Sequence, residues 1–409
     1  MGTDTGWSRA AGESSGRWRT ILERATGRGR SAEPEEQEPP NLPAQRADDA
    51  TAVFPAALPP AGYQPAPYPP AGGRPAPAYT PPPAYAPPPA YAPPPAYTPP
   101  PAYPPAPAPP DGAATRSGAA AGPLPPPSSA PLGVAVTPGS PAERAVRILR
   151  RNLGVPRVVA FANPKGGVHK TTATVLAAAA IGGARGRGVV AWDDNELRGT
   201  LGLRAGSARH ARTIRHLVAE LAEVELNTGQ SLASRIDDFL RHASDGTYDV
   251  LAGEEDPRFS WRLDPPTVRR VLDLLTRTHE VICVDTGNNV ESGNWRTILE
   301  TADQLVITTV PREDSAFSAD WMMDVLVEAG REELVANAVT VISMTTPRPG
   351  PMQDDLIRHF RGRNRAVCIV PYDPVLEQGG WIDHTVLAQP TREAWLEAAA
   401  VIMEPFGQP

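Results

Sequence analysis

From residue 140 onwards, short apolar runs alternate with longer segments whose apolar positions recur every three or four residues. Short apolar runs between polar residues are typical of buried strands, and the longer spacing is typical of helices that cover a sheet. Repeated alternation of the two predicts an α/β fold with a mainly parallel sheet. The predicted strands lie within residues 157–163, 188–203, 248–252, 280–289, 304–310, 338–344 and 366–370. The predicted helices cover residues 141–153, 170–181, 213–225, 231–242, 266–278, 315–329 and 352–361.

The pattern is different before residue 140, where most of the 51 prolines of the chain lie. A six-residue repeat, PPPAYA or PPPAYT, dominates this part, and a polyproline II helix with three residues per turn would place its tyrosines on one face. Too few aliphatic residues are present to form a core, so residues 31–139 are predicted to be disordered. They form either a plain linker or a docking arm for partners that bind proline-rich segments. The predicted parts are thus 1–30, 31–139 and a single folded domain at 140–409.

One segment occurs twice: residues 15–23 read SGRWRTILE and residues 292–300 read SGNWRTILE. The first copy overlaps a short helix candidate at 17–25. We hypothesise that it competes for the surface on which the second copy docks, and so tunes self-association. The alternative is a duplicated fragment without a role.

Charge and cysteine content narrow the class of protein. The net charge of −7 gives no overall attraction to nucleic acid or anionic lipid. Cys283 and Cys368 each lie inside an apolar run, which indicates buried thiols rather than a disulfide or metal site. No apolar stretch has the length of a transmembrane helix and the N-terminus lacks the apolar region of a signal peptide, so we expect a cytoplasmic protein.

Residues 163–172 read NPKGGVHKTT and connect a predicted strand to a predicted helix. The chain has 39 lysines and arginines, yet only Lys165 and Lys170 are lysines. A compact ammonium fits among phosphate oxygens where a planar guanidinium does not. Backbone N–H groups of the loop and the helix N-terminus would face the same anion, and Thr171 would offer a hydroxyl to Mg²⁺. The stretch therefore predicts a phosphate-binding loop.

The lysine before the glycine pair resembles the deviant Walker A signature, KGGxGKT, of the ParA and MinD ATPases. The resemblance implies a P-loop NTPase fold, ATP and Mg²⁺ as cofactors, and an ATP-dependent homodimer. It also implies that Lys165 reaches the phosphates of the partner while Lys170 serves its own nucleotide. His169 replaces a glycine of the family, and it carries a strain cost if this position needs a positive φ. The expected nucleotide contacts are Lys165, Gly166, Gly167, Val168, His169, Lys170, Thr171 and Thr172.

A second family motif, Asp-x-Asp at a strand end, corresponds to Asp193 and Asn195. In the family the second aspartate positions or activates the attacking water. Asparagine orients water but accepts no proton at neutral pH, although Asp194 or Glu196 is a possible substitute. The catalytic candidates are Lys165, Asp193 and Asn195. Because an asparagine replaces the second aspartate, we expect hydrolysis to be slow or to need a partner.

Two further strand ends carry candidate ligands. Asp285 ends the apolar run VICVD, so it resembles a Walker B aspartate that would hold Mg²⁺ together with Thr171. The run that ends in VPYD resembles the stretch where relatives enclose the adenine base, which makes Pro371 and Asp373 candidates. Pro371 as simple strand punctuation is an equal alternative.

Two functions remain open at this point. The first is a ParA/MinD-like ATPase whose nucleotide-dependent dimer positions or partitions cargo such as a plasmid or a large complex. The second is a mainly non-hydrolysing adaptor of a type VII secretion or conjugation system that recruits partners through the proline-rich arm. The acidic residues of 391–403 argue against a MinD-like membrane tail. The candidate patch for nonspecific DNA binding, with a solvated charged face as the alternative, consists of Arg358, Arg361, Arg363 and Arg365.

Overall fold

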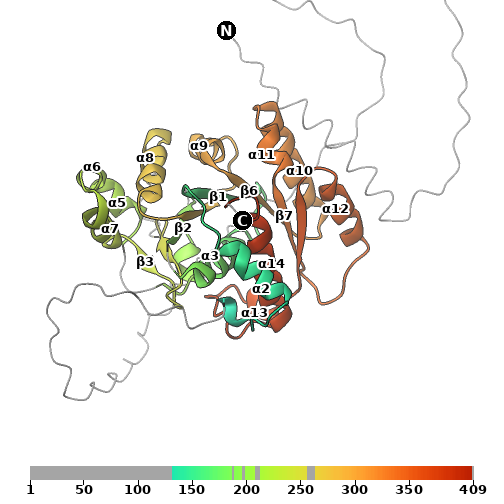
Figure 1. Ribbon diagram of the computed structural model, residues 1–409. Helices are drawn as coiled ribbons and strands as arrows, with labels where there is room; N and C mark the ends of the chain where they lie inside the picture. Colours follow the sequence, from blue (N-terminus) through green and yellow to red (C-terminus); the bar gives the residue numbers. More distant parts are fainter. Residues whose placement is uncertain (1–130, 187, 196–198, 208–211, 256–262, 408–409) are drawn as a thin grey trace, which may run out of the picture. The chain divides into compact units, whose positions relative to one another are not determined.

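A central sheet organises the folded part of the chain (Figure 1). The computed structural model describes residues 131–186, 188–195, 199–207, 212–255 and 263–407. The candidate helix at 17–25, the first copy of the repeated segment and the tyrosine repeat lie outside the described residues.

Within the described residues the strands form one eight-stranded sheet in the order β3-β4-β2-β5-β1-β6-β7-β8. Neighbouring strands are parallel except for the antiparallel pair β3–β4 at one edge. The predicted α/β class with a mainly parallel sheet is confirmed. The strands are β1 (Arg157–Ala162), β2 (Val189–Asp194), β3 (Arg241–His242), β4 (Asp249–Leu251), β5 (Val281–Thr286), β6 (Gln304–Thr309), β7 (Val339–Ser343) and β8 (Ala366–Val370).

Helices cover both faces of the sheet, and each face has its own apolar core. One core is formed with η1 (Pro131–Gly133), α2 (Pro141–Leu149), α3 (Lys170–Arg185), α4 (Leu201–Arg204), α13 (Pro374–Glu377) and α14 (Gln389–Met403). The other is formed with α5 (Ile214–Ala219), α6 (Leu221–Glu225), α7 (Gly229–Asp237), α8 (Pro265–Thr276), α9 (Gly293–Thr301), α10 (Glu313–Glu328), α11 (Glu332–Ala336) and α12 (Met352–Arg361).

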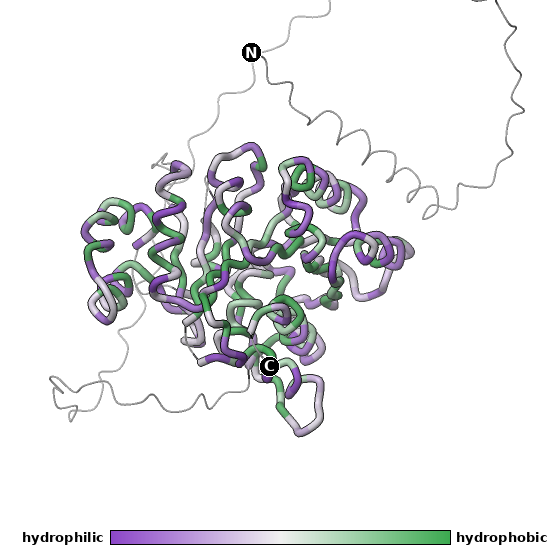
Figure 2. Tube along the Cα trace, turned by 45° about the horizontal axis from the view of Figure 1, so that its top comes forward, coloured by the Kyte–Doolittle hydropathy of each residue, from purple (hydrophilic) through white to green (hydrophobic). Residues whose placement is uncertain are grey.

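Strands covered on both faces explain the continuous apolar runs of the sequence. In β1, Val159 and Phe161 belong to the core on the α3 side, while Val158 and Ala160 belong to the other core. Figure 2 shows the hydrophobic segments concentrated inside and the hydrophilic ones along the outer helices and loops.

Several predicted boundaries need correction. The predicted helix 213–225 is two helices, because Glu220 between α5 and α6 leaves helical geometry with φ −111°. The predicted helix 231–242 ends at Asp237, since residues 241–242 pair with β4 instead. The packed core also begins before residue 140, because Leu132 is only 3% exposed.

Two expectations about chemistry can be compared with the fold. Cys283 is buried and Cys368 is partly buried, both as free thiols. No helix among the described residues combines the length and the apolarity needed to cross a bilayer.

Candidate nucleotide-binding site

The loop between β1 and α3 has the backbone of a phosphate-binding loop. Gly167 and His169 both have positive φ, 75° and 66°, and His169 is the N-cap of α3. Asn163 fixes the start of the loop: its side chain accepts a hydrogen bond from the N–H of Lys165 at 2.9 Å and donates to the carbonyl of Thr308 at 2.8 Å. The sixteen-residue α3 thus begins directly at the loop and places its positive dipole end there.

His169 has a backbone conformation that is unfavourable for residues other than glycine. For a residue with a Cβ, the left-handed region is disfavoured, although histidine is among the non-glycine residues enriched there. Burial lowers the pKa of His169, and the nearby Arg204 and Arg312 lower it further, so the imidazole is neutral at pH 7. A neutral ring adds no charge to the phosphate loop.

Lys170 lies in the interior of the site, where its side chain is held from two sides. Its ammonium donates to the carbonyl of Lys165 at 3.1 Å and to Oδ1 of Asn288. Burial lowers the pKa of Lys170, while the charge of Asp285 acts in the opposite direction. Asn288 was not among the sequence candidates; its place three residues after Asp285 is the only signal that could have identified it.

Thr171 and Asp285 come together at the carboxyl end of the sheet. The Thr171 hydroxyl donates to Oδ2 of Asp285 at 2.6 Å. Burial, together with the charge of Asp193, raises the pKa of Asp285 to about 7. Its other oxygen, Oδ1, is buried and has no hydrogen-bond partner among the described residues. A hydroxyl and a carboxylate with one unsatisfied buried oxygen fit the ligand chemistry of Mg²⁺ and its bound waters.

Asp193 lies opposite Asp285 in the register of β2 and β5, but its carboxylate accepts hydrogen bonds from the backbone. Its two oxygens accept hydrogen bonds from the N–H groups of Asn195 at 3.1 Å and Leu201 at 2.9 Å. Burial raises the pKa of Asp193 to about 6 against these hydrogen bonds. Asp193 does not line the cleft that the P-loop opens into, whereas Asn195 does.

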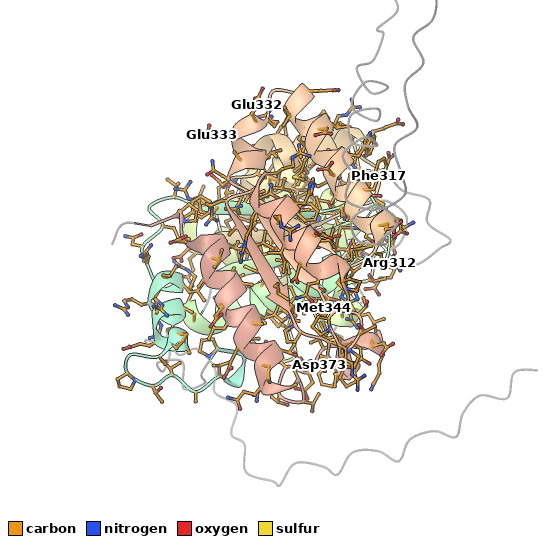
Figure 3. All side chains as sticks on the ribbon, turned by 90° about the vertical axis from the view of Figure 1, so that its right-hand side faces the viewer. Arg312, Phe317, Glu332, Glu333, Met344 and Asp373 are labelled. Atoms are coloured by element: carbon orange, nitrogen blue, oxygen red, sulfur yellow. The ribbon has the colours of Figure 1, made fainter. Side chains whose placement is uncertain are left out.

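That cleft has a volume of about 560 Å³. Its walls come from the P-loop, α4, the ends of β5, β7 and β8, and α13. Pro371 and Asp373 both line it; the carboxylate of Asp373 also caps α13 through the N–H of Val375 at 3.0 Å and accepts the N–H of Ala388 at 2.9 Å. In Figure 3, Asp373 and Met344 lie at the same end of the molecule, away from Glu332 and Glu333 on α11.

Arg204 joins the two sides of the cleft and was missed by sequence reasoning. Its guanidinium donates to the Thr172 hydroxyl at 2.8 Å and to the carbonyl of Gly380. Its own carbonyl accepts the N–H of Ile382 at 2.8 Å. Arg204 therefore ties the P-loop helix to the loop after α13. No sequence motif marks it, because its role depends on segments far apart in the chain.

Lys165 is not brought into the cleft with the other loop residues. Its ammonium pairs with Oδ2 of Asp314 at 3.0 Å, at the start of α10, and its side chain is 41% exposed. The three loop residues Gly166, Gly167 and Val168 line the cleft with His169, Lys170, Thr171 and Thr172.

The arginines of the candidate DNA patch mostly have carboxylate partners. Arg358 pairs with Asp355 at 2.6 Å, Arg365 pairs with Glu404 at 3.2 Å, and Arg363 pairs with Asp320 and Asp324. These pairs compensate much of the positive charge on which DNA binding depends, so direct DNA binding through these arginines stays a prediction.

Comparison with known proteins gives distant structural likenesses. No family model and none of the curated proteins matches the sequence. The solved structures similar to this chain include the cell division ATPase MinD of Pyrococcus furiosus, with 20% identity, a TM-score of 0.48, and 60% of this chain and 98% of that chain covered. A ParA family ATPase from Chlorobium tepidum TLS has 18% identity and a TM-score of 0.45, covering 60% and 90%. A putative plasmid partition protein from Borrelia burgdorferi B31 bound to AMPPNP has 13% identity and a TM-score of 0.44, covering 61% and 100%.

The sheet order and the strand–loop–helix geometry around Lys170 define the architecture. The chain has a P-loop NTPase fold, similar to the folds of these MinD and ParA-family ATPases.

Proposed function

We propose that the chain binds ATP with Mg²⁺ in the cleft and hydrolyses it slowly, as a ParA/MinD-like ATPase. The N–H groups of residues 166–170 and the Lys170 ammonium hold the phosphates. Thr171 and Asp285 would hold Mg²⁺, and the metal would supply positive charge to neutralise the phosphates. Pro371 and Asp373 line the same cleft, and we propose that its side formed by these residues receives the base.

The observation that carries the proposal is the contact between Thr171 and Asp285 directly beside the buried Lys170. A hydroxyl and an ammonium from the first turn of α3 and a carboxylate from the end of β5 meet beside the P-loop. Parallel α/β sheets place ligands at this edge.

Slow hydrolysis follows from the state of the second motif. Asp193 is occupied by two backbone N–H groups, and Asn195 has an amide that orients water without accepting its proton. Glu196 lies outside the described residues, and Asp194 stays an alternative base. If neither accepts the proton, hydrolysis lacks the contribution of proton transfer, typically about 10²- to 10⁴-fold.

The second part of the proposal is ATP-dependent self-association that positions cargo, DNA or a large complex. Its support is the lysine before the glycine pair, which resembles the ParA/MinD signature. Lys165 lies outside its own cleft and is partly exposed, so it is accessible to a second copy.

The test combines self-association and turnover in one sample. Light scattering with ATP and Mg²⁺, with ADP and without nucleotide is recorded beside phosphate release for the full chain. Lys165→Ala and Lys170→Ala form a matched pair, because they remove the same group on either side of the glycine pair. We expect Lys170→Ala to lose nucleotide binding, and Lys165→Ala to keep binding but lose the ATP-dependent dimer.

Asp285→Asn separates the metal site from the phosphate loop. We expect it to lose the Mg²⁺ dependence of ATP binding while binding of ADP without Mg²⁺ remains. Equal binding of ATP by wild type and Lys170→Ala would refute the nucleotide site. Binding with a monomer in every state would refute only the self-association part.

A further inference from the structure

The second copy of the repeated segment is an integral part of the core. Residues 293–300 lie in α9, and the Ser292 hydroxyl caps this helix by accepting the N–H of Asn294 at 3.2 Å. Trp295, Ile298 and Leu299 are all 3% exposed or less. Replacement of α9 by the first copy would require these three side chains to leave the core, and competition for this place stays a prediction.

A groove runs instead beside α9. A cavity of about 340 Å³, within the range of small ligand sites, lies between α9 and the C-terminal part of α10. Its floor is apolar and its rim carries charges of both signs. The floor consists of Val290, Trp295, Leu299, Val325 and Leu326, each at most 9% exposed, and the rim of Arg296, Glu300, Glu328, Ala329 and Arg331.

We propose that residues 15–23 of the same chain dock into this groove as a helix antiparallel to α9. Trp18, Ile21 and Leu22 have the spacing i, i+3, i+4, which places them on one helix face towards the apolar floor. Docking in this groove does not depend on nucleotide binding in the cleft.

The identity of the two copies determines the direction of the pair. Each copy has an arginine at its fifth position and a glutamate at its ninth. Antiparallel helices place Arg19 opposite Glu300 and Glu23 opposite Arg296, whereas parallel helices would place like charges together. Glu300 already pairs with Arg269 at 2.9 Å, but both side chains are about half exposed, so an exchange of partners costs little.

The connecting chain is long enough. Residues 24–130 separate the first copy from the described domain, and at about 3.1 Å per residue, the rise of a proline-rich linker, their contour length is on the order of 300 Å. The first copy can therefore reach the groove of its own chain, and the connection keeps its local concentration high at any dilution.

The test is photo-crosslinking in the full chain, with Trp18 replaced by p-benzoylphenylalanine. Mass spectrometry of the digest is expected to find crosslinks to residues 290–300 and 325–331 in a species with the mass of one chain. The same photoreactive residue in place of Trp7, outside the repeated segment, is the control and is expected to give at least tenfold fewer of these crosslinks.

Charge reversal tests the antiparallel pair. We expect Glu300→Arg to reduce the crosslink yield at least fivefold, and Arg19→Glu in the same chain to restore at least half of it. Glu333→Arg makes the same charge change on α11, outside the groove lining, and should leave the yield unchanged (Figure 3). Thermal unfolding of each variant verifies that the domain remains folded.

Three results would overturn the proposal. Crosslinks to residues of α8 that lie beneath α9 would mean that the first copy replaces α9. Crosslinks between two chains would assign the groove to a second copy. A yield insensitive to Glu300→Arg, or not restored by Arg19→Glu, would remove the antiparallel pairing.

Discussion

His169 shows at the scale of a single residue how the P-loop tolerates a departure from glycine. Its φ of 66° lies in the left-handed region, which favours glycine, and the signature has glycine at this position. From the sequence, strain at His169 was predicted only if this position has a positive φ. The sign of φ could not be predicted, because it depends on how the loop closes onto α3.

The strain can be measured with two variants that remove the same side chain. His169→Gly relieves the left-handed conformation, whereas His169→Ala keeps a Cβ in it. We expect the alanine variant to be less stable than the glycine variant by about 1 kcal/mol, as determined by urea unfolding without nucleotide. Equal unfolding midpoints would mean that the loop relaxes and that no strain is stored at this position.

Arg204 gives a second prediction at this scale, because one guanidinium bonds to both sides of the cleft. A lysine has a single point donor and cannot replace both bonds. We expect Arg204→Lys to lower stability by about 1 to 2 kcal/mol and to weaken nucleotide binding, as measured by unfolding and by titration. Arg358→Lys, in an exposed pair on α12, is the control and should change neither quantity. An Arg204→Lys variant that binds like the wild type would show that the tether does not shape the cleft.

At the scale of the elements, the packing of α10 against α12 depends on one buried acid. Asp320 is fully buried and accepts hydrogen bonds from His359 at 2.8 Å and from Arg363. Burial by itself would raise the pKa of Asp320, but the hydrogen bond of His359 and the charge of Arg363 outweigh it and hold the pKa below its ordinary value.

This depressed pKa predicts a pH dependence with a definite sign. The stability that the Asp320 carboxylate contributes is present above its unfolded pKa of about 4 and is lost as the pH falls through the folded value. Asp320→Asn should therefore cost about 3 kcal/mol at pH 7, and less at pH 3, in unfolding curves recorded across this range. Asp354→Asn on the exposed side of α12 should give a curve parallel to that of the wild type. A constant difference between Asp320→Asn and wild type from pH 7 to pH 3 would contradict the assignment.

Elements with a strong apolar period were predictable from the sequence, and those held by tertiary contacts were not. Helix α12 spans 352–361 and β8 spans 366–370, as the pattern predicts. Strand β3 was not predicted, because two residues are too few to show a periodic pattern. Its pairing with β4 outweighs the helical pattern of residues 231–242. The short α4, which carries Arg204, escaped for the same reason.

At the scale of the whole molecule, the candidate site arises from strand order. Asp193 and Asp285 are far apart in the chain but lie opposite each other in the register of β2 and β5. Sequence motifs placed both residues at strand ends. They did not reveal that Asp193 would turn to the backbone or that Lys165 would pair with Asp314, because side-chain partners come from elements whose packing the motifs do not describe.

The pair of Lys165 and Asp314 leads to a prediction about assembly. It is an exposed ion pair, so Asp314→Asn should change stability by less than about 0.5 kcal/mol. Because Lys165 loses its partner, we expect more ATP-dependent dimer at the same concentration, measured by light scattering. Asp238→Asn, at the C-cap of α7, removes an ion pair with Arg235 that has the same length and the same exposure of the acid, and it should leave the dimer unchanged. Less dimer in Asp314→Asn would mean that Asp314 orients Lys165 for the second copy. It would contradict the expectation that Asp314 competes with the second copy for Lys165.

The two edges of the sheet have unequal consequences for handling the protein. At one edge, β3 is two residues long and carries Arg241 and His242, and short charged edges resist the addition of a foreign strand. At the other edge, β8 is a five-residue run, Ala-Val-Cys-Ile-Val, without a charge, and Ile369 is 36% exposed. Runs of this kind are templates for aggregation. Association at high concentration should therefore begin at β8 regardless of nucleotide, and a scattering signal would report the proposed ATP-dependent association only after the nucleotide-free signal is subtracted.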